Sequence, residues 1–326
     1  MQGKEASEQE TKAKSNVGID VSKDWLDVHA LPSGERRRVA NSCEGIRQLK
    51  RWLMRLELAL VVVEATGKWH RHVQRSLAAS GIPVAVTDPF RVRMFAKAQG
   101  ILAKTDRLDA RVLAQFAAVM APPVRAPEPK NLEELRELVV TRARAVEQQT
   151  RLKNERSAAT FTFLQRHLDR RIERGDKDIA ALDAAILNSV KADADLARRY
   201  AILTSIAGIG LITAVTLLAS LPELGHCTVK QIAMLAGLAP ISDQSGRREG
   251  ARVVWGGRAN VRRILYLAAL AATRFNADLK VFYQRMTAAG KPPKTALIAV
   301  ARKLAVLANT LISQDRTWLP QAPKYA

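Results

Sequence analysis

The sequence predicts an α/β domain joined to a mainly helical region, on three observations. Between residues 17 and 119, short apolar runs rich in β-branched residues alternate with segments of helical spacing. That alternation is typical of a mixed sheet with helices on its faces. Residues 121–130 hold four prolines, which favours a stiff linker. Residues 131–200 contain no proline and one glycine, as expected of long helices.

The first part of the α/β domain is expected to form three strands and a helix. Residues 17–31 alternate apolar and polar side chains and predict two strands joined by a turn. Residues 36–40 predict a third, short strand. Residues 43–56 place four apolar side chains at helical spacing, which predicts a helix.

The second part adds two buried strands and two helices. Residues 58–65 are a short, continuous apolar run, as in a strand that is buried on both faces. A helix is expected over 68–80, and a second buried strand over 82–86, where an Asp-Pro pair stops it. A helix over 105–119 completes an order of three strands, helix, strand, helix, strand, helix.

The segment 131–200 predicts an antiparallel pair of helices, with the break near residues 173–177 or somewhat earlier. Its apolar stripe is irregular, so it only partly matches a strict coiled coil. Further helices are expected at the positions where apolar residues again follow helical spacing, namely 229–237, 259–273 and 293–313. A polar, glycine-rich loop at 242–258 separates the first two of these.

The segment 201–222 carries no charge and is long enough to span a bilayer. Gly208, Gly210 and Pro222 interrupt or end it, and several hydroxyl side chains lie within it. We therefore expect buried core helices and no membrane span, with a single membrane helix as the alternative.

These patterns divide the chain into five segments. The only cysteines, Cys43 and Cys227, lie far apart, which excludes a disulfide scaffold and a cysteine-rich zinc site and suits a reducing cytoplasm. The expected segments are a polar tail at 1–15, an α/β domain at 16–120, a linker at 121–130, a helical segment at 131–200 and a C-terminal domain at 201–320.

The charge of the chain points to a polyanionic partner. It has 52 Lys and Arg against 31 Asp and Glu, a formal net charge of +21. Residues 251–326 hold 13 of the positive charges and two of the negative ones. Such a local excess attracts nucleic acid, whose phosphates dominate its affinity for proteins. A generally basic protein with a solvated face is the alternative.

Four carboxylates lie at the ends of two predicted strands and at the start of a predicted helix, and these elements are expected to pack together. Asp20 and Glu64 end two strands, and Asp106 and Asp109 share one face of the helix at 105–119. Four oxygen donors of this kind suit Mg²⁺ or Mn²⁺, which catalyse phosphoryl transfer in pairs. Each acid by itself could equally cap a turn or lie on a solvated face. Asp27 is left out, because its odd, seven-residue step from Asp20 predicts that it faces away.

A serine lies in a basic loop of the C-terminal domain. Ser245 and Gly246 are followed by Arg247 and Arg248. A hydroxyl can attack a phosphodiester, and guanidinium groups can bind and neutralise the phosphate. An ordinary surface loop explains the pattern as well, and Ser242 competes for the role of nucleophile.

Two other segments have features of nucleic-acid binding. The turn with Gly208 and Gly210 is similar to a helix-hairpin-helix, whose backbone N–H groups contact phosphates, although a tight turn in the core explains it equally well. A tryptophan and two glycines precede Arg258, Arg262 and Arg263, which could bind a strand or simply begin a basic helix.

Together these motifs resemble the DEDD transposases of bacterial insertion sequences, specifically the insertion sequence one-ten group, which is related to Piv-type DNA invertases. The resemblance runs in order from about residue 17 to residue 312. The segments that carry it are VGID, VVVEATG, KTDRLDA, SIAGIG, AGLAPISDQSG and GGRANVRR. The last of these is richer in arginine than the general pattern of the family.

The resemblance implies an RNase H-like, RuvC-type N-terminal domain, a helical coiled-coil insert and a C-terminal transposase domain. Its four acids correspond to Asp20, Glu64, Asp106 and Asp109, which would hold Mg²⁺, and its serine to Ser245. In such enzymes the serine forms a transient phosphoserine link to DNA.

The resemblance also implies the partners. They are double-stranded DNA, both the element junction and the target, a structured noncoding guide RNA, and further copies of the chain in a homo-oligomer, from dimer to tetramer. The expected location is the bacterial cytoplasm, on the nucleoid.

Three other functions compete with a serine recombinase. A RuvC-like nuclease would cut with metal-activated water and keep its activity in Ser245→Ala. A protein that only binds nucleic acid, without catalysis, would keep its function unchanged in Asp20→Asn. An ATPase of the actin or sugar-kinase type also begins with a strand reading GID, but residues 63–68 match a phosphate-binding loop poorly.

Overall fold

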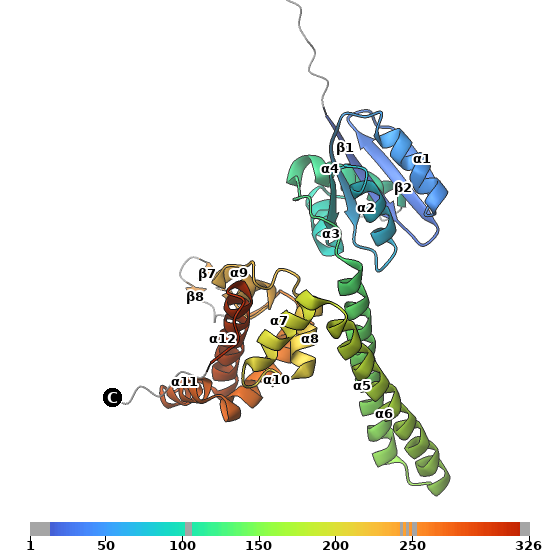
Figure 1. The fold of residues 1–326 in the computed structure, drawn as a ribbon. Coiled ribbons are helices and arrows are strands. Elements are labelled where there is room, and N and C mark those ends of the chain that lie inside the picture. The colour runs from blue at the N-terminus through green and yellow to red at the C-terminus, as the bar shows by residue number, and fades with distance from the viewer. Residues whose placement is uncertain (1–13, 102–105, 242–243, 246–247, 250–252, 320–326) are drawn as a thin grey trace, which may run out of the picture. The chain divides into compact units, whose positions relative to one another are not determined.

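The computed structural model of the chain describes residues 14–101, 106–241, 244–245, 248–249 and 253–319. It divides into two compact units, Met1–Glu128 and Pro129–Ala326. Each is described by itself (Figure 1).

A mixed, five-stranded sheet forms the centre of the first unit, in the order β3-β2-β1-β4-β5. The first three strands pair antiparallel, whereas β4 pairs parallel with both β1 and β5. This confirms the mixed sheet expected from the sequence. The strands are β1 Ser15–Val21, β2 Trp25–Leu31, β3 Arg36–Ala40, β4 Leu58–Glu64 and β5 Val84–Thr87.

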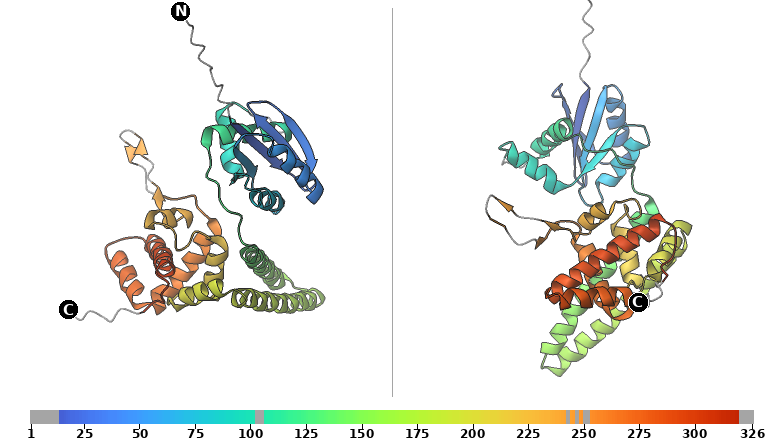
Figure 2. Two further views of the ribbon diagram at one scale, coloured as in Figure 1. Left: turned by 45° about the horizontal axis from the view of Figure 1, so that its top comes forward. Right: turned by 90° about the vertical axis from the view of Figure 1, so that its left-hand side faces the viewer.

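Helices cover both faces of this sheet, as the right-hand view of Figure 2 shows. One face, with Ile19 and Val63, packs on the first two helices. The other, with Val62 and Ala85, packs on the last two. The helices are α1 Cys43–Leu53, α2 His70–Ala78, α3 Pro89–Ala98 and α4 Asp106–Met120.

Helix α3 was not expected from the sequence. The Asp88-Pro89 pair ends β5, but it also starts a helix: the Asp88 carboxylate accepts a hydrogen bond from the N–H of Phe90, and Pro89 occupies the first turn. Proline is favoured there because its fixed φ suits a helix and no N–H is needed. Val92 and Ala96 then bury one side of the helix.

The second unit begins with two long helices, α5 Lys130–Ala158 and α6 Thr162–Lys191, which run side by side in both figures. This confirms the helical pair. The break does not lie at residues 173–177 but earlier, at 159–161, on the side that the prediction left open. Gly175 lies inside α6, and its lack of a side chain leaves room for the side chain of Gln149 in α5. The Gln149 amide is buried and donates hydrogen bonds to Ile172 O at 2.7 Å and to Asp176 at 2.6 Å.

The remaining helices pack around one apolar core. They are α7 Ala194–Ser205, α8 Leu211–Ser220, α9 Val229–Leu235, α10 Ala259–Phe275, α11 Ala277–Ala288 and α12 Pro293–Ser313. Four strands of two residues each, β6 Pro240–Ile241, β7 Gln244–Ser245, β8 Arg248–Glu249 and β9 Val253–Val254, pair as β6 with β9 and β7 with β8.

The uncharged segment 201–222 is not a membrane span. It folds as the end of α7, a turn and α8, and neither helix is long enough to cross a bilayer. Residues 213–219 of α8 are buried in the core. Among the helices of the described ranges, α12 alone is long and apolar enough to cross a membrane, and half of its most apolar window is buried inside the unit.

Candidate active site

A row of polar side chains crosses the sheet where β1 and β4 end. Asp20 lies directly opposite Asp27, and Asp27 lies opposite Arg38. On the other side of β1, Ile19 is aligned with Val63, so the next residues, Asp20 and Glu64, point to one face. This face is the one that α4 covers.

Contact with Gly18 brings the start of α4 close to this row. A Cβ at Gly18 would collide with the backbone of Ala110 and of Ala114, so the helix backbone lies directly on β1. Asp109 precedes Ala110 and is half-buried, and Asp20 is two residues beyond Gly18. The absent side chain at position 18 therefore lets the helix that carries Asp109 pack directly on the strand that carries Asp20. Asp106 begins α4, but its side chain lies outside the described residues.

The position of Asp27 corrects the sequence analysis. A seven-residue step does not turn it away from Asp20, because the two lie opposite one another in an antiparallel pair and so share a face. Counting residues fails across the turn that joins the strands. Asp27 is only 9% exposed. Arg38 holds its carboxylate with two hydrogen bonds, Nε–Oδ1 at 2.8 Å and Nη2–Oδ2 at 2.7 Å.

The strand and helix acids have the donor chemistry of a divalent-metal site. Asp20 and Glu64 on adjacent strands of one face, with Asp109 on α4, offer the carboxylate oxygens that Mg²⁺ and Mn²⁺ prefer. Among the side chains that the structure describes, no three His, Cys, Asp or Glu residues are close enough to hold an ion. The Asp106 carboxyl is not among those side chains.

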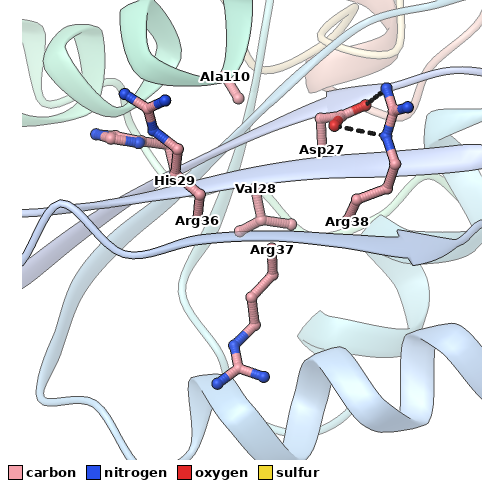
Figure 3. A pocket seen from close by; sticks show the side chains of 7 residues that line it. All are labelled: Asp27, Val28, His29, Arg36, Arg37, Arg38 and Ala110. Carbon is pink, nitrogen blue, oxygen red and sulfur yellow. Dashed lines mark hydrogen bonds and ion pairs between the residues drawn. The ribbon is translucent and has the colours of Figure 1, made fainter. Parts of the chain in front are cut away.

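A basic pocket of about 280 Å³ opens at the free edge of the same sheet (Figure 3). In this view His29 and Arg36 extend towards Ala110 of α4, whereas Arg37 extends to the opposite side. His29 is only 4% exposed. Its burial, followed by the positive charges of Arg36 and Arg111, lowers the pKa of His29 below its usual value. This pocket was not predicted from the sequence, although polar residues alternate with buried apolar ones along residues 26–30.

The predicted serine lies in a small hairpin of the second unit. Ser245 in β7 pairs with Arg248 in β8, so the backbone of these two residues is side by side. Gly246, Arg247 and Ser242 lie outside the described residues, as do the side chains of Ser245 and Arg248.

The three arginines at the start of α10 contact the protein itself. Arg258 forms a two-point ion pair with Glu223, at 2.7 and 2.8 Å. Arg262 donates to the carbonyl oxygen of Gly256 at 2.7 Å. Arg263 lies 3.2 Å from Glu147, and both of these side chains are more than half exposed. Of the three, Arg263 is thus the most accessible to a phosphate.

The two glycines of the α7–α8 turn differ in their surroundings. Gly208 has a φ of +105°, and a Cβ there would lie 2.6 Å from the Cβ of Ala272 in α10. The close approach of α10 therefore accounts for this glycine. Gly210 precedes α8, and a Cβ there would meet no atom within 4 Å. Its amide lies at a helix N-terminus, where phosphate binding remains a prediction.

Comparison with known proteins places the two groups of residues in two matching regions. Residues 17–168 match a family model of DEDD transposases of the IS110 type, and residues 200–284 match the transposase IS116/IS110/IS902 family. The pilin gene-inverting proteins of Moraxella bovis and Moraxella lacunata are each 27% identical over 93% of this chain and 97% of their own length. An insertion element IS110 protein of 43.6 kDa from Streptomyces coelicolor is 33% identical over 31% of this chain and 26% of its own length.

Proposed function

Because this chain belongs to the IS110 family of transposases, and so is an enzyme of DNA recombination, we propose that it breaks and rejoins DNA strands at the ends of an insertion sequence with a serine nucleophile and a carboxylate metal site. The observation that carries the proposal is the convergence of Asp20 and Glu64 with the start of α4 on one face of the sheet. The second family match spans the hairpin that contains Ser245.

The first unit then has the RNase H-like, RuvC-type fold over residues 16–120. An order of β3-β2-β1-β4-β5, with three antiparallel strands followed by two parallel ones, supports this. The Pro-rich residues 121–130 serve as the linker, residues 131–200 as the coiled-coil insert and residues 201–320 as the transposase domain.

Asp20, Glu64, Asp106 and Asp109 together hold Mg²⁺ or Mn²⁺. Such an ion supplies positive charge to the oxygens that attack and leave the phosphorus. Gly18 supports the arrangement, because its lack of a side chain lets α4 carry Asp109 down onto β1. The Asp27 carboxylate is already paired with Arg38, so it positions the neighbouring strand and binds no metal.

Ser245 Oγ attacks the phosphorus of a DNA phosphodiester. A bond forms between Oγ and phosphorus, the bond to one sugar oxygen breaks, and that oxygen leaves as a hydroxyl with the proton that the serine gave up. Rejoining reverses these steps with a sugar hydroxyl of another strand, and the serine recovers its proton. Arg247 and Arg248 neutralise the phosphate during both steps. Arg258, Arg262, Arg263 and the turn at Gly208 and Gly210 bind the strands nearby.

The partners are double-stranded DNA at the element junction and target, a structured noncoding guide RNA, and other copies of the chain in a dimer or tetramer. A net charge of +21 supports contacts with nucleic acid. The work takes place in the bacterial cytoplasm.

A covalent-adduct assay tests this function. The full-length protein is mixed with Mg²⁺, labelled junction DNA and the flanking noncoding RNA, then denatured and separated on a gel. We expect a protein–DNA band from the wild type that is absent from Ser245→Ala and Asp106→Asn. Ser242→Ala is the matched control, because it removes a hydroxyl from the same loop and should keep the band.

Other results would identify the competing functions. Cleavage without a band, equal in wild type and Ser245→Ala, would replace the serine recombinase with a nuclease that uses water. A band that persists in Ser245→Ala and disappears in Ser242→Ala would move the nucleophile three residues towards the N-terminus.

A further inference from the structure

His29, one of the residues that line the basic pocket at the edge of the sheet, has a buried ring nitrogen without a partner in the part of the chain that the structure describes. His29 Nδ1 is inaccessible to solvent, and no hydrogen-bonding group among the described residues reaches it. A buried polar atom without a partner is costly, on the order of 1–3 kcal/mol. Such an atom needs an explanation, and a bound ion or water molecule is one of them.

Two arginines determine the sign of the charge around this ring. Arg36, on the edge strand, lines the pocket. Arg111, on α4, directly follows Ala110, which also lines the pocket, and its positive charge acts on His29. Within the described ranges, neither is paired with a carboxylate. The pocket's one acid, Asp27, is neutralised by Arg38 through their two hydrogen bonds. The side chains that line the pocket therefore carry a net positive charge, which favours an anion.

The size of the pocket limits that anion. At about 280 Å³ it lies just below the range of about 300–1,000 Å³ typical of sites for whole small molecules. A phosphate group fits the combination of two guanidinium groups and an imidazole, since Arg matches phosphate geometry and binds it bidentately. A base or a nucleoside would need an apolar or aromatic surface, whereas most of the side chains here are charged.

The pocket lies beside the row of acids. His29 is paired with Gly18, and Asp27 with Asp20, on the same face of β1 and β2. Two residues along a strand correspond to about 7 Å. An anion bound at His29 would thus lie close to Asp20, at about the distance that two residues span along a strand.

From this geometry we propose that His29, Arg36 and Arg111 form a subsite for a backbone phosphate of a nucleic-acid strand, next to the carboxylates of the first unit. The subsite holds the strand in register while the neighbouring acids and the serine act on it. Only the identity of the ligand as nucleic acid rests on the proposed function.

Salt-dependent binding tests the subsite without any chemistry. Binding of the full chain to labelled duplex DNA, and separately to labelled structured RNA, is measured by fluorescence anisotropy. The buffer contains a chelator, and the salt concentration is varied. Each phosphate contact contributes about 0.9 to the slope of log K against log salt for a duplex and about 0.7 for a single strand. Arg36→Gln and Arg111→Gln should each lower the slope by up to about 1 for the nucleic acid that occupies the subsite. If the slope falls for DNA, the phosphate comes from DNA; if it falls for RNA, the phosphate comes from RNA.

Arg37→Gln is the matched control. It removes the same charge from the same strand. Arg37 also borders the pocket, but its guanidinium extends to the other face of the sheet and lies 5.1 Å from the Trp52 ring. The subsite is wrong if Arg37→Gln lowers the slope as much as Arg36→Gln, or if neither does so with either nucleic acid. Thermal unfolding of each variant checks that the fold is kept.

A second measurement reads the ring directly. Inorganic phosphate is titrated into the full chain while the His29 NMR signal is followed. The signal should shift in the wild type and in Arg37→Gln, and stay still in Arg36→Gln/Arg111→Gln. A shift that survives the double substitution would overturn the subsite. Neither measurement uses Ser245 or Mg²⁺, so loss of the covalent adduct and loss of this subsite are separate results.

Discussion

Arg38 and Asp27 face each other across the edge strands, and their ion pair is unequally exposed: the carboxylate is nearly buried, whereas the Arg38 side chain is 49% exposed. Arg38→Gln should lower the free energy of unfolding by about 1–3 kcal/mol, since it leaves a buried carboxylate without its cation. Solvent at Arg38 keeps the loss in the lower part of that range. Arg38→Gln/Asp27→Asn should recover most of it. Urea unfolding of the three proteins measures this, and losses that simply add would contradict it.

His29 makes the stability of the first unit sensitive to acid. Burial, with Arg36 and Arg111 on either side, lowers its pKa in the folded protein, whereas the unfolded value is about 6.5. The unfolded chain therefore binds a proton first, and stability falls as the pH drops below about 6.5. His29→Gln should show a smaller loss of melting temperature than the wild type between about pH 8 and about pH 5. Parallel curves would exclude His29 as the cause.

At the scale of elements, the contact of α4 with β1 requires that residue 18 has no side chain. Gly18→Ala should destabilise the fold by about 1–3 kcal/mol, because helix backbone cannot move aside as a side chain can. It should also abolish the covalent adduct by displacing Asp109. Gly210→Ala, where a methyl meets no atom within 4 Å, should change stability by less than about 1 kcal/mol. Equal effects in unfolding experiments would contradict the contact.

Most elements of the first unit could be predicted, since β1, β2, β4 and β5 are short apolar or alternating segments with clear ends, whereas β3 begins with three arginines. Two features could not. Asp88-Pro89 marks both the end of β5 and the start of α3. The two residues end a strand in either case, and they do not show whether a loop or a helix follows. Gly175 weakens helix propensity locally, yet α6 continues through it because Gln149 needs the space. Tertiary contacts outweighed local preference there.

The positions of the acids were partly predictable for a similar reason. Asp20 and Glu64 end parallel neighbours, so their common edge follows from strand order. The side of the sheet on which Asp27 lies depends instead on the register of β1 with β2, which the three-residue turn between them determines. His29 showed no motif, and its importance arises only from the burial and the arginines around it.

At the scale of the whole molecule, the two units divide the chemistry between them. The carboxylates lie in Met1–Glu128 and the serine hairpin in Pro129–Ala326, each within its own family match. The positive charge is spread over both, with a strong excess after residue 250. If the proposed function holds, the groups that break the phosphodiester bond are therefore contributed by both units.

The three consecutive arginines of β3 have a consequence for solubility. This strand is the open edge of the sheet, where unpaired backbone groups invite a strand from another molecule. Arg36, Arg37 and Arg38 are all exposed there. A second copy approaching edge to edge would bring like charges together on both faces of the sheet, so these three arginines oppose pairing of this edge with another molecule.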